Sequence, residues 1–330
     1  MSQNKSDKIL TALIIVIAVA GLIYFGISAI MDDSRQSQGN PFDYELEIFK
    51  QNGRETLAYK EILTVSLDLV TPYALALDAA DKLYVTGDRL VLLFDANKHL
   101  TARVPTDRPV SALAVDDNGD IYCAAGEYIE VLDSTGAKKA RWQHLGVDAI
   151  LTSIAVGEND VYLADAGQLV VWHFNKAGDL LGEIGKKDVA RDIPGFVIPS
   201  PYFDVFIDAD GFLWAVNTGM HQFQNFNQDG SMRSFWSRTA MTVDGFSGCC
   251  NPSHAAMLQD GSFVTAEKGL VRVKIHNRAG EFVCLVAAPD QFDKGTVGLD
   301  LAVDSNGRIH VLDPKRKQVR IFEKMEDDSE

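Results

Sequence analysis

Short apolar runs alternate with polar turns near the end of the chain, in residues 298–322. The runs 299–303 and 309–312 are apolar, and residues 318–322 alternate between apolar and polar side chains. The polar segments Asp304–Gly307 and 313–317 separate them. Asn and Gly tolerate the positive φ that a tight hairpin needs, and a period of two is typical of half-buried strands. The pattern predicts three antiparallel strands.

The same unit occurs five more times upstream, starting at residues 73, 111, 152, 203 and 253. Its turn position recurs at intervals of 38 to 51 residues, which is typical of propeller blades. Candidate fourth strands follow five of the copies, at 102–104, 140–143, 180–184, 232–236 and 281–286. The chain is therefore predicted to be an all-β protein with a six-bladed β-propeller. The equivalent turn positions are Asp78, Asp116, Gly157, Asp208, Leu258 and Asp304.

The sixth copy has no fourth strand of its own, because the chain runs out near Phe322. Strand-like residues at 44–68 are expected to complete it and close the ring, which removes exposed sheet edges. We expect the propeller to span 44–323 and an acidic tail to follow at 324–330. A β-sandwich is the alternative all-β fold, but it gives no reason for a repeat of this length.

The segment from Ile9 to Met31 contains 23 apolar or small residues and no charge. That length is enough to cross a membrane as a helix, and it exceeds the usual apolar region of a signal peptide. Lys5 and Lys8 precede it and acidic residues follow it, which favours a cytoplasmic N-terminus at 1–8. We expect a single-pass anchor at 9–31, a linker at 32–43 and a periplasmic or extracellular propeller. A cleaved signal peptide, cut after 27–29, is the alternative.

Two segments resemble the NHL repeat, in which a strand ends at a short polar turn and then restarts. They are LWAVNTGMHQFQNF at 213–226 and IHVLDPKRKQVRIF at 309–322. The resemblance covers residues 70–323 and extends more distantly to gluconolactonase/regucalcin-like and amidating-lyase propellers. It implies a six-bladed propeller. Because such proteins include extracytoplasmic binding domains, protein-interaction modules, lyases and lactonases, it leaves the activity open.

The chain is acidic, with a net charge of −15 and an isoelectric point near 4.9. A nucleic-acid-binding protein would normally present a basic face, so this class is excluded. No glycine-rich phosphate loop, nucleophile elbow or HExxH motif is present in the sequence. The expected partners are the membrane, through the N-terminal helix, and a protein of the cell envelope.

Aligning the six copies places three chemically interesting residues at one level of the expected inner strands. Two residues before each turn position the copies carry mostly Ala, as a crowded central channel requires: Ala76, Ala114, Ala155, Phe206, Ala256 and Ala302. Two residues earlier, and on the same side of the strand, they carry Ala74, Ala112, Ser153, Asp204, His254 and Asp300.

Asp204, His254 and Asp300 could together bind a divalent metal or act as an acid/base pair. The resemblance also implies metal binding in this region, since related lyases and lactonases hold metals on inner-strand residues. The alternative is structural: the two carboxylates accept hydrogen bonds from neighbouring strands, and His254 is their partner.

Two long loops, 185–202 and 237–252, are expected on the rim beside these residues. Long loops clustered on one rim often bind ligands. The first ends at Tyr202 and the second at Asn251-Pro252, directly before His254. We therefore include Tyr202, Asn251 and Ser153 among the candidate ligand-binding residues.

Cys249 and Cys250 are adjacent in the second loop. They could form a vicinal disulfide, bind a soft metal with His254, or act as a redox pair. Cys284 lies in the same repeat and could pair with one of them. Cys123 lies in the middle of an expected strand and is interpreted as a buried thiol.

Three functions remain open on the sequence alone. The leading hypothesis is a membrane-anchored binding or scaffold module whose protein or small-molecule ligand meets the rim. The second is a metal-assisted lyase or hydrolase that uses Asp204, His254 and Asp300. The third is an accessory subunit of a membrane redox complex that uses Cys249 and Cys250.

Overall fold

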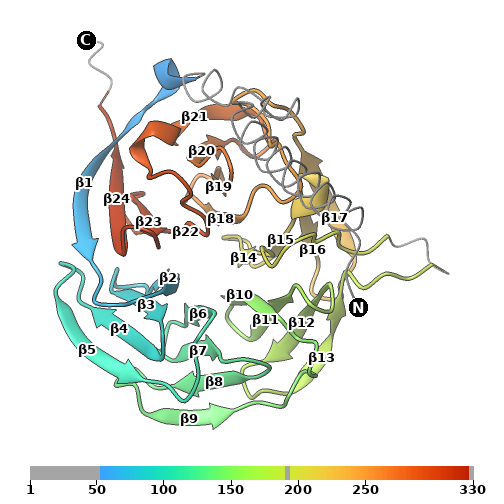
Figure 1. Ribbon diagram of the computed structural model, residues 1–330. Helices are drawn as coiled ribbons and strands as arrows, with labels where there is room; N and C mark the ends of the chain where they lie inside the picture. The colour runs from blue at the N-terminus through green and yellow to red at the C-terminus, as the bar shows by residue number, and fades with distance from the viewer. Residues whose placement is uncertain (1–52, 190–193, 327–330) are drawn as a thin grey trace, which may run out of the picture. The chain divides into compact units, whose positions relative to one another are not determined.

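The computed structural model describes residues 53–189 and 194–326. These residues form six four-stranded antiparallel sheets arranged as blades around a central channel (Figure 1). The six-bladed propeller expected from the repeats is confirmed. The predicted anchor at 9–31 lies outside the described residues. Within them, no helix is both long and apolar enough to cross a membrane.

Each blade runs from an inner strand at the channel to an outer strand at the perimeter, and in blades 1 to 5 all four strands follow chain order. Blade 1 contains β2 (Pro72–Leu77), β3 (Leu83–Gly87), β4 (Leu90–Phe94) and β5 (Leu100–Pro105). Blade 2 contains β6 (Ala112–Val115), β7 (Ile121–Ala124), β8 (Ile129–Leu132) and β9 (Lys138–Arg141). Blade 3 contains β10 (Leu151–Val156), β11 (Asp160–Asp165), β12 (Val170–Asn175) and β13 (Leu180–Ile184).

The remaining blades follow the same order. Blade 4 contains β14 (Val205–Ile207), β15 (Leu213–Asn217), β16 (Gln222–Phe226) and β17 (Met232–Ser237). Blade 5 contains β18 (His254–Met257), β19 (Phe263–Glu267), β20 (Arg272–His276) and β21 (Phe282–Ala287). Blade 6 contains β22 (Asp300–Val303), β23 (Ile309–Asp313), β24 (Gln318–Lys324) and, outermost, the N-terminal β1 (Tyr59–Ser66). Three short 3-10 helices, η1 (Arg54–Thr56), η2 (Thr218–Met220) and η3 (Pro289–Gln291), lie in the connections.

The repeated Asp builds the turn between the first two strands of a blade. Asp304 Oδ1 accepts hydrogen bonds from the backbone N–H groups of Asn306 (3.0 Å) and Arg308 (2.9 Å), and its Oδ2 lies 3.2 Å from His310 Nε2. Asp side chains favour such turns because they bond to the backbone two residues on. Asp78, Asp116 and Asp208 make the same turn bonds and accept a further hydrogen bond from the side chains of Tyr84, Tyr122 and Trp214.

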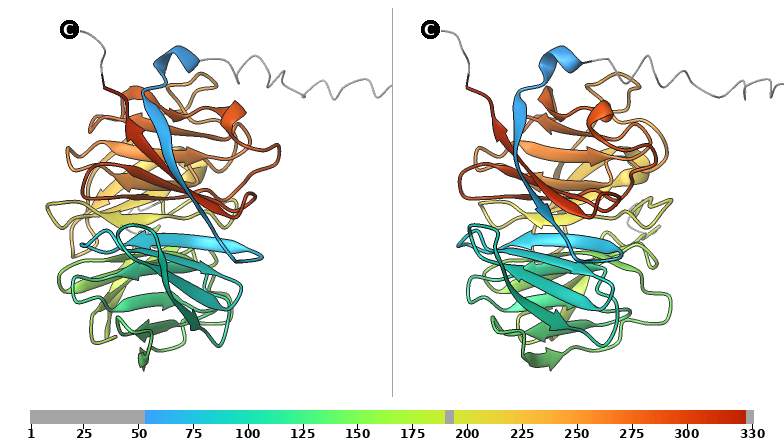
Figure 2. Two further views of the ribbon diagram at one scale, coloured as in Figure 1. Left: turned by 90° about the vertical axis from the view of Figure 1, so that its left-hand side faces the viewer. Right: turned by 60° about the vertical axis from the view of Figure 1, so that its left-hand side comes forward.

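β1 completes blade 6 by pairing antiparallel with β24, from Tyr59 opposite Lys324 to Ser66 opposite Gln318. In Figures 1 and 2 the blue strand runs along the outside of the red last blade. The ring is thus closed by a strand from the other end of the chain, so β24 presents no free edge. The hydrophobic core lies between successive blades; one cluster joins residues of β1, β3, β4, β23 and β24 across this closure.

Candidate functional site

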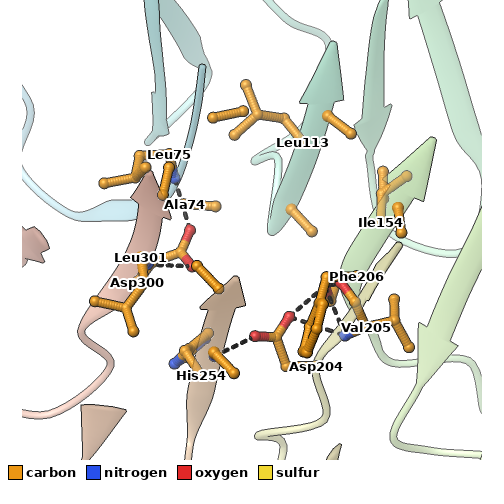
Figure 3. Close-up of a pocket in the computed structure, with 18 of the residues that line it drawn as sticks. Ala74, Leu75, Leu113, Ile154, Asp204, Val205, Phe206, His254, Asp300 and Leu301 are labelled. Atoms are coloured by element: carbon orange, nitrogen blue, oxygen red, sulfur yellow. Dashed lines mark hydrogen bonds between the residues drawn. The ribbon is translucent and has the colours of Figure 1, made fainter. Parts of the chain in front are cut away.

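Ser153, Asp204, His254 and Asp300 lie at one end of the central channel, which we call the channel mouth. Ser153 belongs to β10, Asp204 directly precedes β14, and His254 and Asp300 begin β18 and β22. All four line a cavity of about 360 Å³ that follows the inner strands. Figure 3 shows Asp204 and Asp300 on either side of the strand that carries His254. The structure therefore brings these predicted residues to the same cavity.

Both carboxylates join neighbouring blades. Asp204 Oδ2 accepts a hydrogen bond from the N–H of Ala255 in blade 5 (2.7 Å), and its Oδ1 accepts one from Ser153 Oγ in blade 3 (2.5 Å). Asp300 Oδ2 accepts one from the N–H of Leu75 in blade 1 (2.7 Å). Oδ1 of each carboxylate also accepts a hydrogen bond from the backbone N–H of the following residue, Val205 for Asp204 and Leu301 for Asp300. These dashed contacts in Figure 3 fit the structural alternative.

Burial at the channel mouth penalises the charged form of both acids. Burial raises the pKa of Asp204, although His254 and the hydrogen bonds from Ser153 and the backbone oppose the shift. Burial likewise raises the pKa of Asp300 to about 6; His254 opposes this shift, and the charge of Asp204 adds to it. Two carboxylates in one poorly hydrated site repel each other, which is why a shared site raises such pKa values. Asp300 is thus able to exchange a proton near neutral pH.

His254 is the residue at the channel mouth whose polar atoms are not used by the fold. Its Nδ1 atom is shielded from solvent and has no hydrogen-bond partner among the described residues. The ring of Tyr202 stands edge-on to the imidazole, with the ring centroids 5.8 Å apart. Buried polar groups usually find a partner. Because His254 also lines the cavity, its side chain is a candidate contact for a ligand.

The structure adds no support for the predicted metal site at Asp204, His254 and Asp300, which stays a prediction. Within residues 53–189 and 194–326, no three His, Cys, Asp or Glu side chains are arranged to hold a metal ion. The physical reason is the use of the carboxylate oxygens: all four accept hydrogen bonds from backbone N–H groups or Ser153. A metal ion would have to share these oxygens with the hydrogen bonds between blades.

The first rim loop is anchored in its described part, 185–189 and 194–202. Phe196 is buried against Phe203 and Phe226, with ring centroids 4.7 and 6.0 Å apart. The N–H of Val197 donates to Asn217 Oδ1 (2.9 Å), which ties the loop to the turn after β15. The loop thus brings the half-buried Tyr202 to the channel mouth on a fixed segment.

The second rim loop differs from the expectation that all of 237–252 would line the rim. Phe246 is fully buried, and the buried Lys274 of β20 donates to the carbonyl oxygens of Val243 (3.0 Å) and Gly245 (2.6 Å). Arg272 and Lys274 both pair with the buried Glu267, at 2.7 and 2.8 Å. The first half of the loop is therefore packed on outer strands, and residues 247–252 continue toward the mouth.

Sequence reasoning did not identify this buried charge cluster of Glu267, Arg272 and Lys274. Alternating charges in a strand normally indicate a solvent-exposed face. The available signal was the run Arg272-Val-Lys-Ile-His276, which places three basic or polar side chains on one face of a strand beside an unusually long loop. Only the position of that loop shows that they are covered.

Asn251 has a structural role rather than the predicted ligand-binding one. It is buried; its Nδ2 donates to the carbonyl oxygens of Ser247 (2.7 Å) and Lys268 (3.0 Å), and its Oδ1 accepts from the N–H of Lys268 (2.9 Å). Its own carbonyl oxygen lies 2.9 Å from Nδ1 of His221. These bonds use the whole amide and fix the loop against the turn between β19 and β20.

The four cysteines are free thiols. Cys284, which could pair with Cys249 or Cys250, is buried in the outer strand β21, within the core shared by blades 5 and 6. Cys123 is fully buried, and burial raises the pKa of its thiol to about 12, as befits an inert core residue. The Sγ atoms of Cys249 and Cys250 lie 3.0 Å apart.

Comparison with known proteins identifies the fold. No protein-family model matches the sequence, so the NHL assignment has no support from sequence, and no curated protein sequence matches either. A streptogramin B lyase structure superposes with a TM-score of 0.59 at 12% identity, covering 81% of this chain and 98% of that chain. Virginiamycin B lyase from Staphylococcus aureus gives 0.56 at 11% identity, covering 81% and 100%. The WD40 β-propeller domain of Doa1 gives 0.54 at 13%, covering 77% and 79%. At these identities the likeness shows the six-bladed propeller fold alone.

Proposed function

We propose that this chain is a membrane-anchored, extracytoplasmic β-propeller that acts as a binding module, with its ligand at the channel mouth and the adjoining rim. The observation that carries the proposal is the cavity itself, which contains two carboxylates and an imidazole with an unpartnered nitrogen. Such a concave site with a few convergent polar groups is the usual form of a ligand pocket. The anchor rests on the uncharged run from Ile9 to Met31.

The chemistry of the site selects a ligand that donates hydrogen bonds. Asp204 and Asp300 accept when ionised, and each carboxylate has about four lone-pair sites, of which the fold uses only some. A protonated amine, either free or on a Lys side chain of an envelope protein, satisfies these acceptors. The ring of Tyr202 adds an aromatic wall beside His254.

Ligand-observed NMR with n-butylammonium tests the proposal, and butyrate serves as the anionic control. We expect butylammonium, and not butyrate, to bind the purified chain. His254→Lys should abolish binding, because its own ammonium group would occupy the mouth without removing either Asp. His144→Lys, at an exposed position outside the mouth, should leave binding unchanged. Equal binding by wild type and His254→Lys would refute the site.

The anchor is tested separately by fractionation. The full-length chain should remain with membranes after alkaline carbonate extraction, whereas a chain that starts at residue 40 should be released. Release of the full-length chain would exclude a spanning anchor.

A second candidate is an acid/base lyase, favoured by the raised pKa of Asp300 next to His254. A catalytically inactive variant of virginiamycin B lyase has been solved with quinupristin, so quinupristin is a suitable probe. The lyase candidate requires that the purified chain consume quinupristin, as followed by mass spectrometry, and that His254→Ala abolish this. If quinupristin is not consumed, it is not a substrate of this chain, and the binding proposal is unaffected.

A further inference from the structure

Cys249 and Cys250 differ sharply in exposure although they are adjacent. Cys249 is exposed, whereas the side chain of Cys250 lies in the interior with a residue exposure of 1%. Their sulfur atoms are 3.0 Å apart and each is a thiol. The accessible sulfur of Cys249 is thus in contact with the buried sulfur of Cys250. Neither the fold nor the channel-mouth site uses this pair.

The ammonium group of Lys268 lies beside the protected sulfur. Lys268, in the turn between β19 and β20, donates through Nζ to Ser200 Oγ (3.1 Å) and lies 4.7 Å from the ring centroid of Tyr202. Burial raises the pKa of the Cys250 thiol, but hydrogen bonds from Ser200, Cys249 and Lys268 outweigh it and lower the pKa below its ordinary value. The pair therefore loses its first proton more readily than an isolated cysteine does, and the charge resides mainly on Cys250.

Asn251 keeps this arrangement in place. Both ends of its amide bond to the backbone of Lys268, and Nδ2 also reaches Ser247. The chain on either side of the two cysteines is thus fixed to the same turn that carries the ammonium group. Such pre-organised positioning is what a reactive site requires.

We propose that Cys249 and Cys250 form a reversible dithiol–disulfide centre that reacts with disulfide-bearing compounds, with Cys249 as the attacking thiol, Cys250 as the resolving thiol and Lys268 as a positioning residue. This proposal goes beyond ligand binding at the channel mouth and does not depend on it.

The reaction balances in two steps. The pair starts with Cys250 as the thiolate. Cys249 Sγ attacks one sulfur of the partner R–S–S–R and passes its proton to the Cys250 thiolate; a Cys249–S–S–R bond forms, and the partner's S–S bond breaks to release RS⁻. Cys250 gives its proton to this leaving thiolate and then attacks Cys249 Sγ. The Cys249–Cys250 bond forms, and the second RS⁻ leaves and takes a proton from water. The two cysteines are oxidised by two electrons, and the partner is reduced to two thiols.

The product is easily reduced, so the centre can turn over in both directions. Adjacent residues in a trans peptide have Cα atoms about 3.8 Å apart, whereas disulfides usually span roughly 4.4–6.8 Å. A bond between neighbours is therefore less stable than an ordinary structural disulfide, and an external thiol can reopen it.

The test equilibrates the reduced full-length chain with mixtures of glutathione and glutathione disulfide, traps free thiols with N-ethylmaleimide and identifies them by mass spectrometry. We expect Cys249 and Cys250 to lose their label together and to regain it as the mixture becomes reducing, while the buried Cys123 and Cys284 do not change. Cys250→Ser should stop at a glutathione adduct on Cys249, and Cys249→Ser should form no adduct. A parallel experiment uses insulin, whose reduction causes turbidity. The substrate that is reduced faster, insulin or glutathione disulfide, shows whether the centre prefers a protein disulfide or a small one.

Lysine variants test the positioning role. Lys268→Met should slow conversion at neutral pH by roughly three- to tenfold and move the pH profile of alkylation upward, because the thiolate loses its facing charge. Lys268→Arg should restore most of the rate, and the exposed Lys294→Met should react as wild type. Thermal melting verifies that each variant is folded. Thiols that persist in excess glutathione disulfide, or a pair that oxidises only in urea, would overturn the proposal.

Discussion

Asp300 joins the last blade to the first through the channel rather than through the outer sheet. Its two carboxylate oxygens accept from Leu75 in β2 and from Leu301 in its own strand. Asp204 makes the equivalent connection from blade 4 to blade 5, through Ala255. The two acids thus hold the inner strands together while they line the proposed binding cavity, so structural and ligand-binding roles compete for the same oxygens.

Asp300→Asn should change both the stability of the protein and its dependence on pH. The folded-state pKa of about 6 lies above the ordinary value of roughly 4, so between these pH values the folded chain binds more protons than the unfolded chain. This contribution to the free energy of unfolding is complete below pH ~4 and is lost as the pH rises through ~6. The variant should lack that slope.

The same substitution should also lower stability by about 1–2 kcal/mol near pH 4, where Asp300 is neutral in both states, because the amide NH₂ cannot accept one of the two backbone hydrogen bonds. This deficit should shrink as the pH rises through ~6, since only wild type loses stability there. Urea unfolding from pH 4 to 7 measures both effects. The exposed Asp210→Asn is the control and should resemble wild type in both respects. A wild-type slope that persists in Asp300→Asn would assign the pH dependence to another group.

At the level of elements, charged side chains of blade 5 bind the backbone of loop 237–252, which precedes β18. Lys274 and Arg272 donate to carbonyl oxygens of residues 242–245, and both also pair with the carboxylate of Glu267. A buried backbone carbonyl must have a partner, and a loop that crosses the outer strands of a sheet has no ladder to supply one. The buried charges fill that need. They also fix the start of the segment that ends at Cys249, Cys250 and Asn251.

Lys274→Met should therefore release the loop. Val243 loses its donor, Gly245 keeps only the longer hydrogen bond from Arg272, and Glu267 keeps one partner instead of two, so we expect a loss of about 2–4 kcal/mol of stability. Hydrogen exchange followed by mass spectrometry should show faster exchange in residues 238–246 than in the rest of blade 5. Lys139→Met, at an exposed position of β9, should alter stability by no more than about 0.5 kcal/mol. If amide exchange in residues 238–246 is as slow in Lys274→Met as in wild type, Lys274 does not hold this loop.

At the scale of the whole molecule, the ring is closed by one strand from the N-terminal side. β1 pairs with β24 over its full length, and Arg320 of β24 reaches Glu61 of β1 with Nη2 2.6 Å and Nε 3.0 Å from Oε2. β1 and the residues after it bury Tyr59, Val65, Leu67 and Leu69. Each such side chain contributes roughly 1.5–3 kcal/mol on burial, so the closure is comparable to the ~5–15 kcal/mol that stabilises a typical domain.

A chain that starts at residue 70 should therefore fail to form a stable monomer. Its β24 edge would be free to pair with other chains, since exposed edges promote association. A chain that starts at residue 53 keeps β1 and is the matched control; it should elute as a monomer and melt cooperatively. Size-exclusion chromatography with light scattering and a thermal melt measure both properties. A monomeric, cooperatively melting chain from residue 70 would show that the ring does not need its closing strand.

Much of the propeller was predictable because its signals are local. The spacing of Asp78, Asp116, Asp208 and Asp304 reflects turns that are built within a few residues, and alternation in the strands follows from burial of one face. The register of the inner strands also placed Asp204, His254 and Asp300 at one level. In contrast, the side chains of Lys274 and Asn251 donate hydrogen bonds to backbone carbonyl oxygens that lie 31 and 17 residues away in sequence. No residue pattern marks such partners.

The sequence by itself determined the number of blades, their order and the level of the channel-mouth residues, because periodicity and turn chemistry act over short distances. Only the tertiary structure decided what those residues do. It showed that Asp204 and Asp300 use their oxygens between blades, that His254 is left with an unpartnered nitrogen, and that Lys268 and Ser200 face Cys250. Hydrogen bonding and the local dielectric depend on which side chains meet in space, and that is a property of the closed ring rather than of any one repeat.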